Sequence, residues 1–78
     1  MTDPKLHPPS LSPTLGDICS KAIEYHHAGQ LEAAETVYRA VLQADPRHPL
    51  ANYQLGLLIF QLQRPEAALP YLLVALEA

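Results

Sequence analysis

The sequence of 78 residues has few of the side chains that cross-link small domains. It contains a single cysteine, Cys19, so no disulfide can form within the chain. Its four histidines are scattered, and the neighbours His26 and His27 would point about a third of a turn apart on a helix, which suits one metal ion poorly. We therefore expect neither a metal nor a cofactor. A core this small contributes only about 3 to 5 kcal/mol, so helix packing must stabilise the chain.

Positive charge is also scarce. Five Lys and Arg residues stand against eight Asp and Glu residues, which gives a net charge of −3, and the cations are not clustered. Nucleic acids and anionic membranes are bound by clustered cations, so we predict that the partner is a protein. The N-terminus lacks the basic start and apolar run of a secretory signal, and the later apolar stretches are interrupted by Asn, Gln and Gly. We predict a cytoplasmic protein.

The sequence also lacks the signatures of catalysis. It contains no paired carboxylates, glycine-rich phosphate loop, nucleophile elbow or metal motif. Cys19 has no activating base at helical spacing, because Lys21 is two residues away and on another side of the helix. The thiol should therefore be buried or line a groove. We predict that this chain is not itself an enzyme.

Proline, in contrast, is abundant and divides the chain. Four of the eight prolines lie within residues 1–13, which have few apolar groups, so we predict a flexible proline-rich N-terminal segment there. These prolines make no Pro-x-x-Pro core, which argues against a ligand for an SH3-type domain.

From residue 14 onward the apolar residues recur at three- and four-residue spacing, which predicts an all-α chain. The first helix should begin at Ser12-Pro13, or two residues later at a cap formed by Thr14 and Asp17, and should end at Gly29. A second helix is predicted over residues 31–44, where the favourable order of Glu35 and Arg39 adds a few tenths of a kcal/mol.

Prolines also delimit two more helices. The Asp45-Pro46 pair should end the second helix, and Pro49 should open a third over residues 49–62. The third helix carries no charge and is apolar around nearly its whole circumference, so it must be covered on more than one side. The fourth should open at Arg64-Pro65-Glu66, with Pro70 facing outward and bending its first two turns.

The chain repeats itself. Residues 66–68, Glu-Ala-Ala, restate residues 32–34 after thirty-four residues, and in the same register Leu42 recurs as Leu76 and Ala44 as Ala78. A period of this length indicates a helical repeat protein in which each unit is a pair of helices.

The period and the residues at fixed places resemble the tetratricopeptide repeat family, whose pattern is Trp-x2-Leu-Gly-x2-Tyr followed by Ala-x3-Phe and Pro. The positions that fit this pattern are Ala22, Tyr25, Ala34, Tyr38 and Pro46 in the first copy, and Leu55, Gly56, Ala68 and Leu72 in the second. The sequence departs from the pattern with Ile18 and Asn52 for the tryptophan, Lys21 for the leucine and Ile59 for the tyrosine.

This resemblance implies two stacked antiparallel helical hairpins, with repeats at about 15–48 and 49–78. The small residues should mark close approach within each hairpin, Ala22 against Ala34 and Gly56 against Ala68. The positions expected to pack the repeats are Ala22, Ala34, Tyr38, Pro46, Leu55, Gly56, Ala68 and Leu72.

The resemblance also implies a concave groove that binds extended peptides or partner helices. The positions it places on this groove are Cys19, Ile23, His26, Tyr53, Gln54, Leu57, Phe60 and Gln61, with Ser20 near its rim. Family members that bind chaperones clamp a terminal carboxylate with lysine and asparagine, which are replaced here by Cys19, Ile23 and Tyr53. We therefore expect a preference for an apolar or aromatic segment, with hydrogen bonds from the two amides. Alternatively, many of these apolar side chains are plain core.

Two classes of function follow from the resemblance. In the first, the chain is a protein-interaction module. In the second, it is the N-terminal, substrate-recruiting part of an enzyme, because residues 29–46 resemble bacterial repeat segments that precede nucleotide-sugar glycosyltransferase, sulfotransferase or methyltransferase domains. An asparagine ladder of the O-GlcNAc-transferase type is not expected, since Ser20 and Gln54 stand at those places.

Two repeats that end in the more apolar one should leave the last hairpin uncovered. We expect the chain to be the N-terminal piece of a longer protein, or to form a homodimer through its second and fourth helices, with the apolar second repeat in the interface. The alternative is a two-repeat monomer that is just stable enough.

Overall fold

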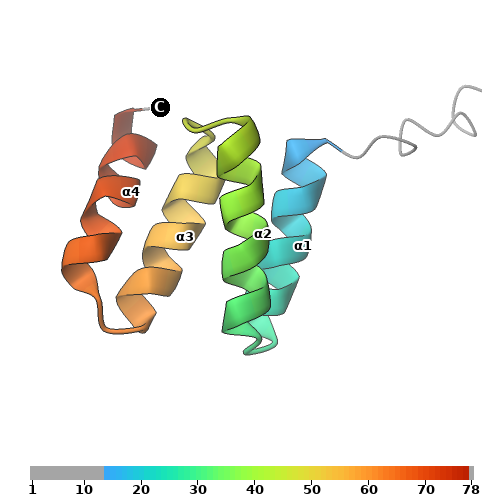
Figure 1. Cartoon of the computed structure of the whole chain (residues 1–78), viewed down its shortest axis with the longest axis horizontal. Coiled ribbons are helices and arrows are strands. Elements are labelled where there is room, and N and C mark those ends of the chain that lie inside the picture. Colours follow the sequence, from blue (N-terminus) through green and yellow to red (C-terminus); the bar gives the residue numbers. More distant parts are fainter. Residues whose placement is uncertain (1–13, 78) are drawn as a thin grey trace, which may run out of the picture.

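The computed structural model describes residues 14–77, and within that range it is built of four helices without a strand. The helices are α1 (Leu15–His27), α2 (Leu31–Ala44), α3 (Pro49–Gln61) and α4 (Pro65–Glu77). They form a row in which α4 lies at one edge and α2 partly covers α1 in the view (Figure 1). The all-α prediction is confirmed. The predicted flexible segment 1–13, and with it the Ser12-Pro13 start, lies outside the described residues.

Side-chain caps and turn residues set the ends of the first hairpin. The Thr14 hydroxyl accepts a hydrogen bond from the Asp17 amide at 3.0 Å, and the Asp17 carboxylate accepts one from the Thr14 amide at 3.2 Å. This reciprocal capping box starts α1 at Leu15, as the alternative start predicted. Gly29 has a φ of +82°, a left-handed conformation that suits glycine, and it separates α1 from α2.

Prolines begin the helices of the second hairpin. Pro49 and Pro65 lie in the first turns of α3 and α4, where the missing N–H leaves no intrahelical bond unmade. α3 ends at Gln61, one residue earlier than predicted, and Gln63 then adopts a φ of 63° that turns the chain. Pro70 lies inside α4 and is exposed, as predicted.

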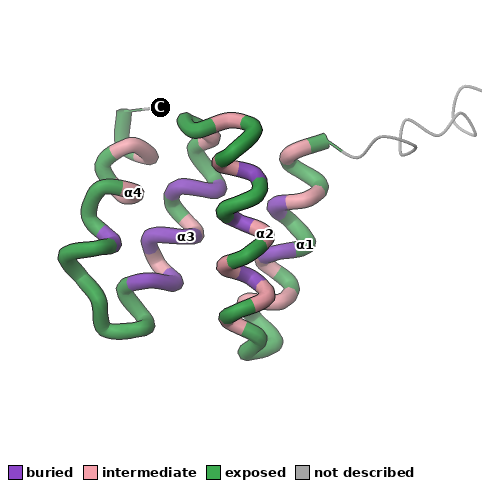
Figure 2. The backbone as a smooth tube through the Cα atoms, in the orientation of Figure 1, coloured by how far each residue is buried: buried purple, intermediate pink, exposed green. Residues whose placement is uncertain are grey.

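The core runs between the helices of each hairpin and between the two hairpins. Contacts join α1 to α2, α3 to α4, α2 to α3 and, less extensively, α1 to α3. The buried turns of α3 and α2 line this interior in Figure 2. Its apolar members are Cys19, Ala22, Ala34, Tyr38, Val41, Ala51, Leu55, Leu58, Ile59 and Ala68.

Two of the repeat positions differ from the rest. Ala22, Ala34, Tyr38, Leu55, Gly56 and Ala68 are buried, whereas Leu72 is half-buried. Pro46 was expected among the packing residues but is exposed, because it lies in the turn between α2 and α3. There its carbonyl accepts a hydrogen bond of 3.1 Å from the buried Asn52 side chain. Pro46 therefore contributes through its backbone.

The apolar surface is concentrated on the second hairpin. Among the described residues, the large apolar side chains that are exposed are Leu50, Tyr53, Phe60, Leu62, Leu69, Leu73 and Leu76, all from α3, α4 and the turn between them. Leu76 is 81% exposed. The outer side of α4 is correspondingly exposed along most of its length (Figure 2).

Candidate functional site

A continuous groove follows α3. One concavity of about 580 Å³ lies between α1 and α3, and we name it the polar cavity; it is lined by His26, His27, Tyr53, Gln54, Leu57, Phe60 and Gln61. A second of about 590 Å³ lies between α3 and α4, and we name it the leucine cavity; it is lined by Pro49, Leu50, Tyr53, Leu57, Leu72, Ala75 and Leu76. Tyr53 and Leu57 line both, so the two cavities adjoin along α3.

The structure brings together most of the residues expected on the groove. The polar cavity contains six of them, namely His26, Tyr53, Gln54, Leu57, Phe60 and Gln61. Helical spacing explains why: Tyr53, Leu57 and Phe60 follow one another at intervals of four and three on the same face of α3. Tyr53 is 47% exposed and Phe60 is 58% exposed, so both rings are open to a ligand.

Cys19 and Ile23 do not lie on the groove. Cys19 was expected there, but its exposed fraction is 0% because it faces the core from α1, so that expectation was wrong. Burial also raises the pKa of the Cys19 thiol, which stays neutral. Ile23 is half-buried, packs against the core and is absent from the lining of both cavities.

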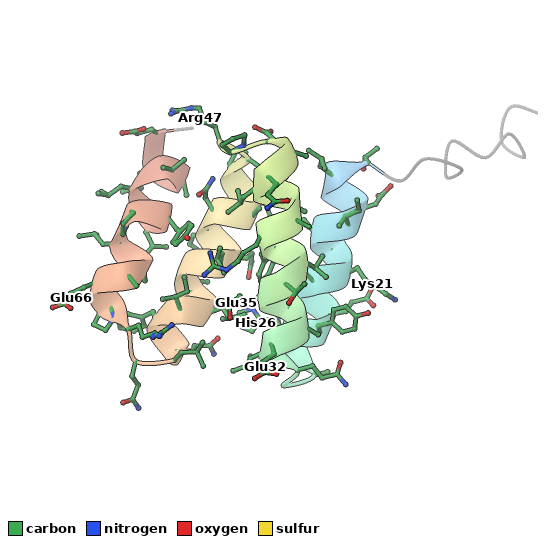
Figure 3. All side chains as sticks on the ribbon, viewed as in Figure 1. Lys21, His26, Glu32, Glu35, Arg47 and Glu66 are labelled. Atoms are coloured by element: carbon green, nitrogen blue, oxygen red, sulfur yellow. The ribbon has the colours of Figure 1, made fainter. Side chains whose placement is uncertain are left out.

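Hydrogen bonds attach the polar cavity to the core. His26 Nδ1 lies 3.2 Å from the Tyr38 hydroxyl, and His26 Nε2 is hydrogen-bonded to the Gln61 side-chain oxygen. These bonds join α1, α2 and α3, and Figure 3 shows His26 beside α2, toward α3. Burial, and secondarily Cys19, raises the pKa of Tyr38 to about 12, so its hydroxyl keeps its proton.

A second tie joins the hairpins through α2 and α4. The Arg39 guanidinium donates a hydrogen bond of 3.0 Å to the Tyr71 hydroxyl and lies 5.8 Å from the centre of the Tyr71 ring. Arg39 is held from the other side by Glu35 at 2.8 Å, the pair predicted from the sequence. This tie and the His26 bonds add polar links to the α2–α3 and α1–α3 contacts that join the two hairpins.

The charged side chains lie away from the groove. Arg47 pairs with Glu77 at 3.3 Å at one end of the molecule, and Figure 3 shows Glu66 near the opposite end of α4. Among the described residues, neither cavity is lined by Asp, Glu, Lys or Arg. The groove therefore offers aromatic, aliphatic, amide and imidazole groups to a ligand.

The leucine cavity was not predicted from the sequence. Its α3 side includes Leu50, and its α4 side consists of Leu72, Ala75 and Leu76, none of which was placed on the groove. The signal that could have revealed it was the uncharged circumference of the third helix, which indicates apolar contacts on more than one side.

The described helices show neither a metal-binding cluster nor a membrane span. Residues 14–77 contain no group of three or more His, Cys, Asp or Glu side chains arranged to hold a metal ion. None of the helices in the described part of the chain has the length and hydropathy needed to cross a bilayer.

Comparison with known proteins gave one informative result. The family model described as tetratricopeptide repeat matches residues 20–78, which is more than half of the chain. Neither the curated proteins nor the solved structures gave a match. The matched range includes all four helices except the first turn and a half of α1.

Proposed function

The chain belongs to the tetratricopeptide repeat family, and from this membership we propose that it is a protein-interaction module whose groove binds an uncharged, apolar segment of a partner protein. Repeats of this kind serve as scaffolds that present a concave surface, and their binding role agrees with the lack of catalytic motifs in the sequence.

The observation that carries this proposal is the pair of adjoining cavities along α3. The leucine cavity is aliphatic, and the polar cavity has exposed rings at Tyr53 and Phe60 beside the amides of Gln54 and Gln61. Burial of a partner's apolar side chain would contribute roughly 25 cal/mol of binding free energy per Å² of apolar area. The amides would hydrogen-bond the partner's backbone.

The same lining argues against an acidic ligand. A carboxylate is bound well by Lys or Arg, and the two cavities are lined by neither within the described residues. A charged side chain in the leucine cavity would lose its hydration without gaining a partner. We therefore propose selection for uncharged segments.

An array of immobilised twelve-residue peptides tests the proposal. Uncharged peptides containing Leu or Phe should retain the labelled chain, and the same peptides with one apolar residue replaced by Glu should not. Tyr53→Ala should weaken capture about tenfold, which corresponds to about 1.4 kcal/mol. The matched control is Glu32→Ala, an exposed position on α2. Equal capture of acidic and uncharged peptides, or a larger loss with Glu32→Ala, would contradict the proposal.

A second candidate function is self-association through α4. Leu69, Leu73 and Leu76 are 54%, 48% and 81% exposed and recur at intervals of four and three, so they form one aliphatic stripe along α4 that adjoins the leucine cavity at Leu76. We propose that a second copy of the chain covers this stripe. The expected pairing through the second helix has less support, because the exposed positions of α2 have no large apolar side chain; they are Glu32, Thr36, Arg39, Ala40, Gln43 and Ala44.

A further inference from the structure

The hydrogen bonds of His26 define which of its ring nitrogens carries the proton. The Gln61 side-chain oxygen can only accept, so the His26 Nε2 that bonds it must be the N–H donor. In the neutral imidazole the other nitrogen, Nδ1, is then an acceptor. The Tyr38 hydroxyl lies 3.2 Å from Nδ1 and donates to it.

Tyr38, the first donor in this series of hydrogen bonds, is held in place by the core. Tyr38 is on α2 with an exposed fraction of 0%, and it packs in the core beside Cys19 and Ala34. Its ring also meets the His26 ring edge-on, with 6.0 Å between ring centres. The position of the hydroxyl that bonds His26 is therefore set by the core.

Gln61, the last residue in this series of hydrogen bonds, faces the groove. Gln61 is exposed at the last turn of α3 and lines the polar cavity. Because His26 donates to one lone pair of its oxygen, the orientation of the amide is fixed and both of its N–H groups are left to donate to a ligand. A free glutamine would instead rotate and offer either its oxygen or its nitrogen.

We propose that His26 is a positioning residue that determines groove specificity: it donates to the oxygen of Gln61 and so fixes the amide with both N–H groups left to donate to a bound partner. The effect on partner choice rests on the proposed function, that the groove binds a segment of another protein. The partner must place an acceptor there, a backbone carbonyl next to an apolar side chain. Proline is compatible with that position, since it keeps its carbonyl and lacks only the N–H.

NMR of the whole chain without a partner tests the orientation. Long-range ¹H–¹⁵N correlation should show His26 with a proton on Nε2 and none on Nδ1. The Gln61 side-chain amide resonances should differ from those of Gln63, an exposed glutamine that serves as the internal control. A proton mainly on Nδ1 would overturn the proposal.

Variants separate positioning from packing. His26→Gln keeps an N–H donor in place of Nε2 and should leave the Gln61 amide resonances close to those of the unmodified chain. His26→Phe keeps a ring without a donor and should move them to the values of Gln63. Unchanged Gln61 resonances in His26→Phe would also overturn the proposal.

The predicted need for a carbonyl acceptor in the partner is tested by weakening the backbone carbonyls of a bound peptide. A peptide captured on the array is resynthesised with one carbonyl at a time replaced by a thiocarbonyl, which is a weaker acceptor. At one position the affinity should fall about tenfold with the unmodified chain and with His26→Gln, and much less with His26→Phe. Uniform insensitivity along the peptide would contradict the specificity role. If no array peptide binds, the proposed function fails, while the NMR result still decides the orientation.

Discussion

At the scale of single residues, Gly56 lies where a side chain has no room. A Cβ built on it would be 2.5 Å from Cδ2 and 2.8 Å from Cγ of Leu72. Gly56→Ala should gain about 1 kcal/mol of helix propensity but lose about 1 to 3 kcal/mol to overpacking. We expect the free energy of unfolding, measured by urea denaturation, to fall by about 1 kcal/mol, the balance of these two effects.

Gly16→Ala is the matched control for this prediction. At Gly16 the nearest atom to a built Cβ is the Thr14 hydroxyl oxygen at 3.6 Å, an ordinary contact, so helix propensity should dominate and stabilise the chain by up to about 1 kcal/mol. In a Leu72→Ala background the cost of Gly56→Ala should disappear. Equal stabilisation by both glycine substitutions would show that α3 and α4 are not in close contact.

Tyr38 gives the chain a pH dependence at high pH. Its pKa is about 12 in the folded chain against an ordinary value of 10.0. Below about pH 10 both states are protonated, and between about pH 10 and 12 the unfolded chain loses its proton first, so the free energy of unfolding falls as the pH rises. The fall attributable to Tyr38 should reach about 2 to 3 kcal/mol.

Tyr38→Phe provides the comparison. This variant loses the bond to His26 and should be less stable by a constant amount below about pH 10, while the part of the pH slope due to Tyr38 should vanish. Urea denaturation followed by circular dichroism from about pH 9 to 11.5 measures both effects. Identical slopes for the two chains would mean that Tyr38 is not buried.

At the scale of helices, the prolines of α4 differ in their effect. Pro70 lies inside the helix, where it cannot donate to the Glu66 carbonyl, and it is exposed. Pro70→Ala should therefore raise the free energy of unfolding by about 1 to 3 kcal/mol. Pro65→Ala replaces a first-turn proline and should change it by less than about 1 kcal/mol. Thermal unfolding of both variants measures the difference. Equal shifts of the unfolding temperature would contradict the prediction.

Helix boundaries were largely predictable because their causes are local. The second helix was predicted at residues 31–44 and α2 has those bounds. The capping box of Thr14 and Asp17 satisfies backbone amides within one turn. Pro49 and Pro65 favour a helix start at their own positions, because a first-turn residue makes no intrahelical N–H bond. α3 ended one residue early because Gln63 turns the chain in a left-handed conformation, which a residue other than glycine rarely signals.

At the scale of the whole molecule, the aliphatic stripe of α4 predicts a dimer. Sedimentation of the chain at tens of micromolar should show an association that weakens when Leu73→Glu places a charge in the stripe. Ala40→Glu introduces the same charge at an exposed position of α2 and is the control. A chain that remains monomeric throughout this range, or equal effects of the two variants, would exclude pairing through α4.

The groove was only partly predictable. The resemblance to the tetratricopeptide repeat family implied that Tyr53, Leu57 and Phe60 lie on the groove, but an uncharged helix gives no sign of which apolar face is covered. Leu55 and Leu58 are buried because α2 and α4 pack against α3. Cys19 was misplaced for a related reason: on α1, core and groove positions are neighbours at helical spacing.

The thirty-four-residue period, the caps and the prolines were enough to establish four helices and a repeat family, because each acts through backbone geometry within a few residues or through simple recurrence. The burial of Cys19, the leucine cavity and the bonds from Tyr38 through His26 to Gln61 depend on how the two hairpins dock. Docking joins His26 to Gln61, thirty-five positions apart, and such contacts leave no periodic trace in the chain.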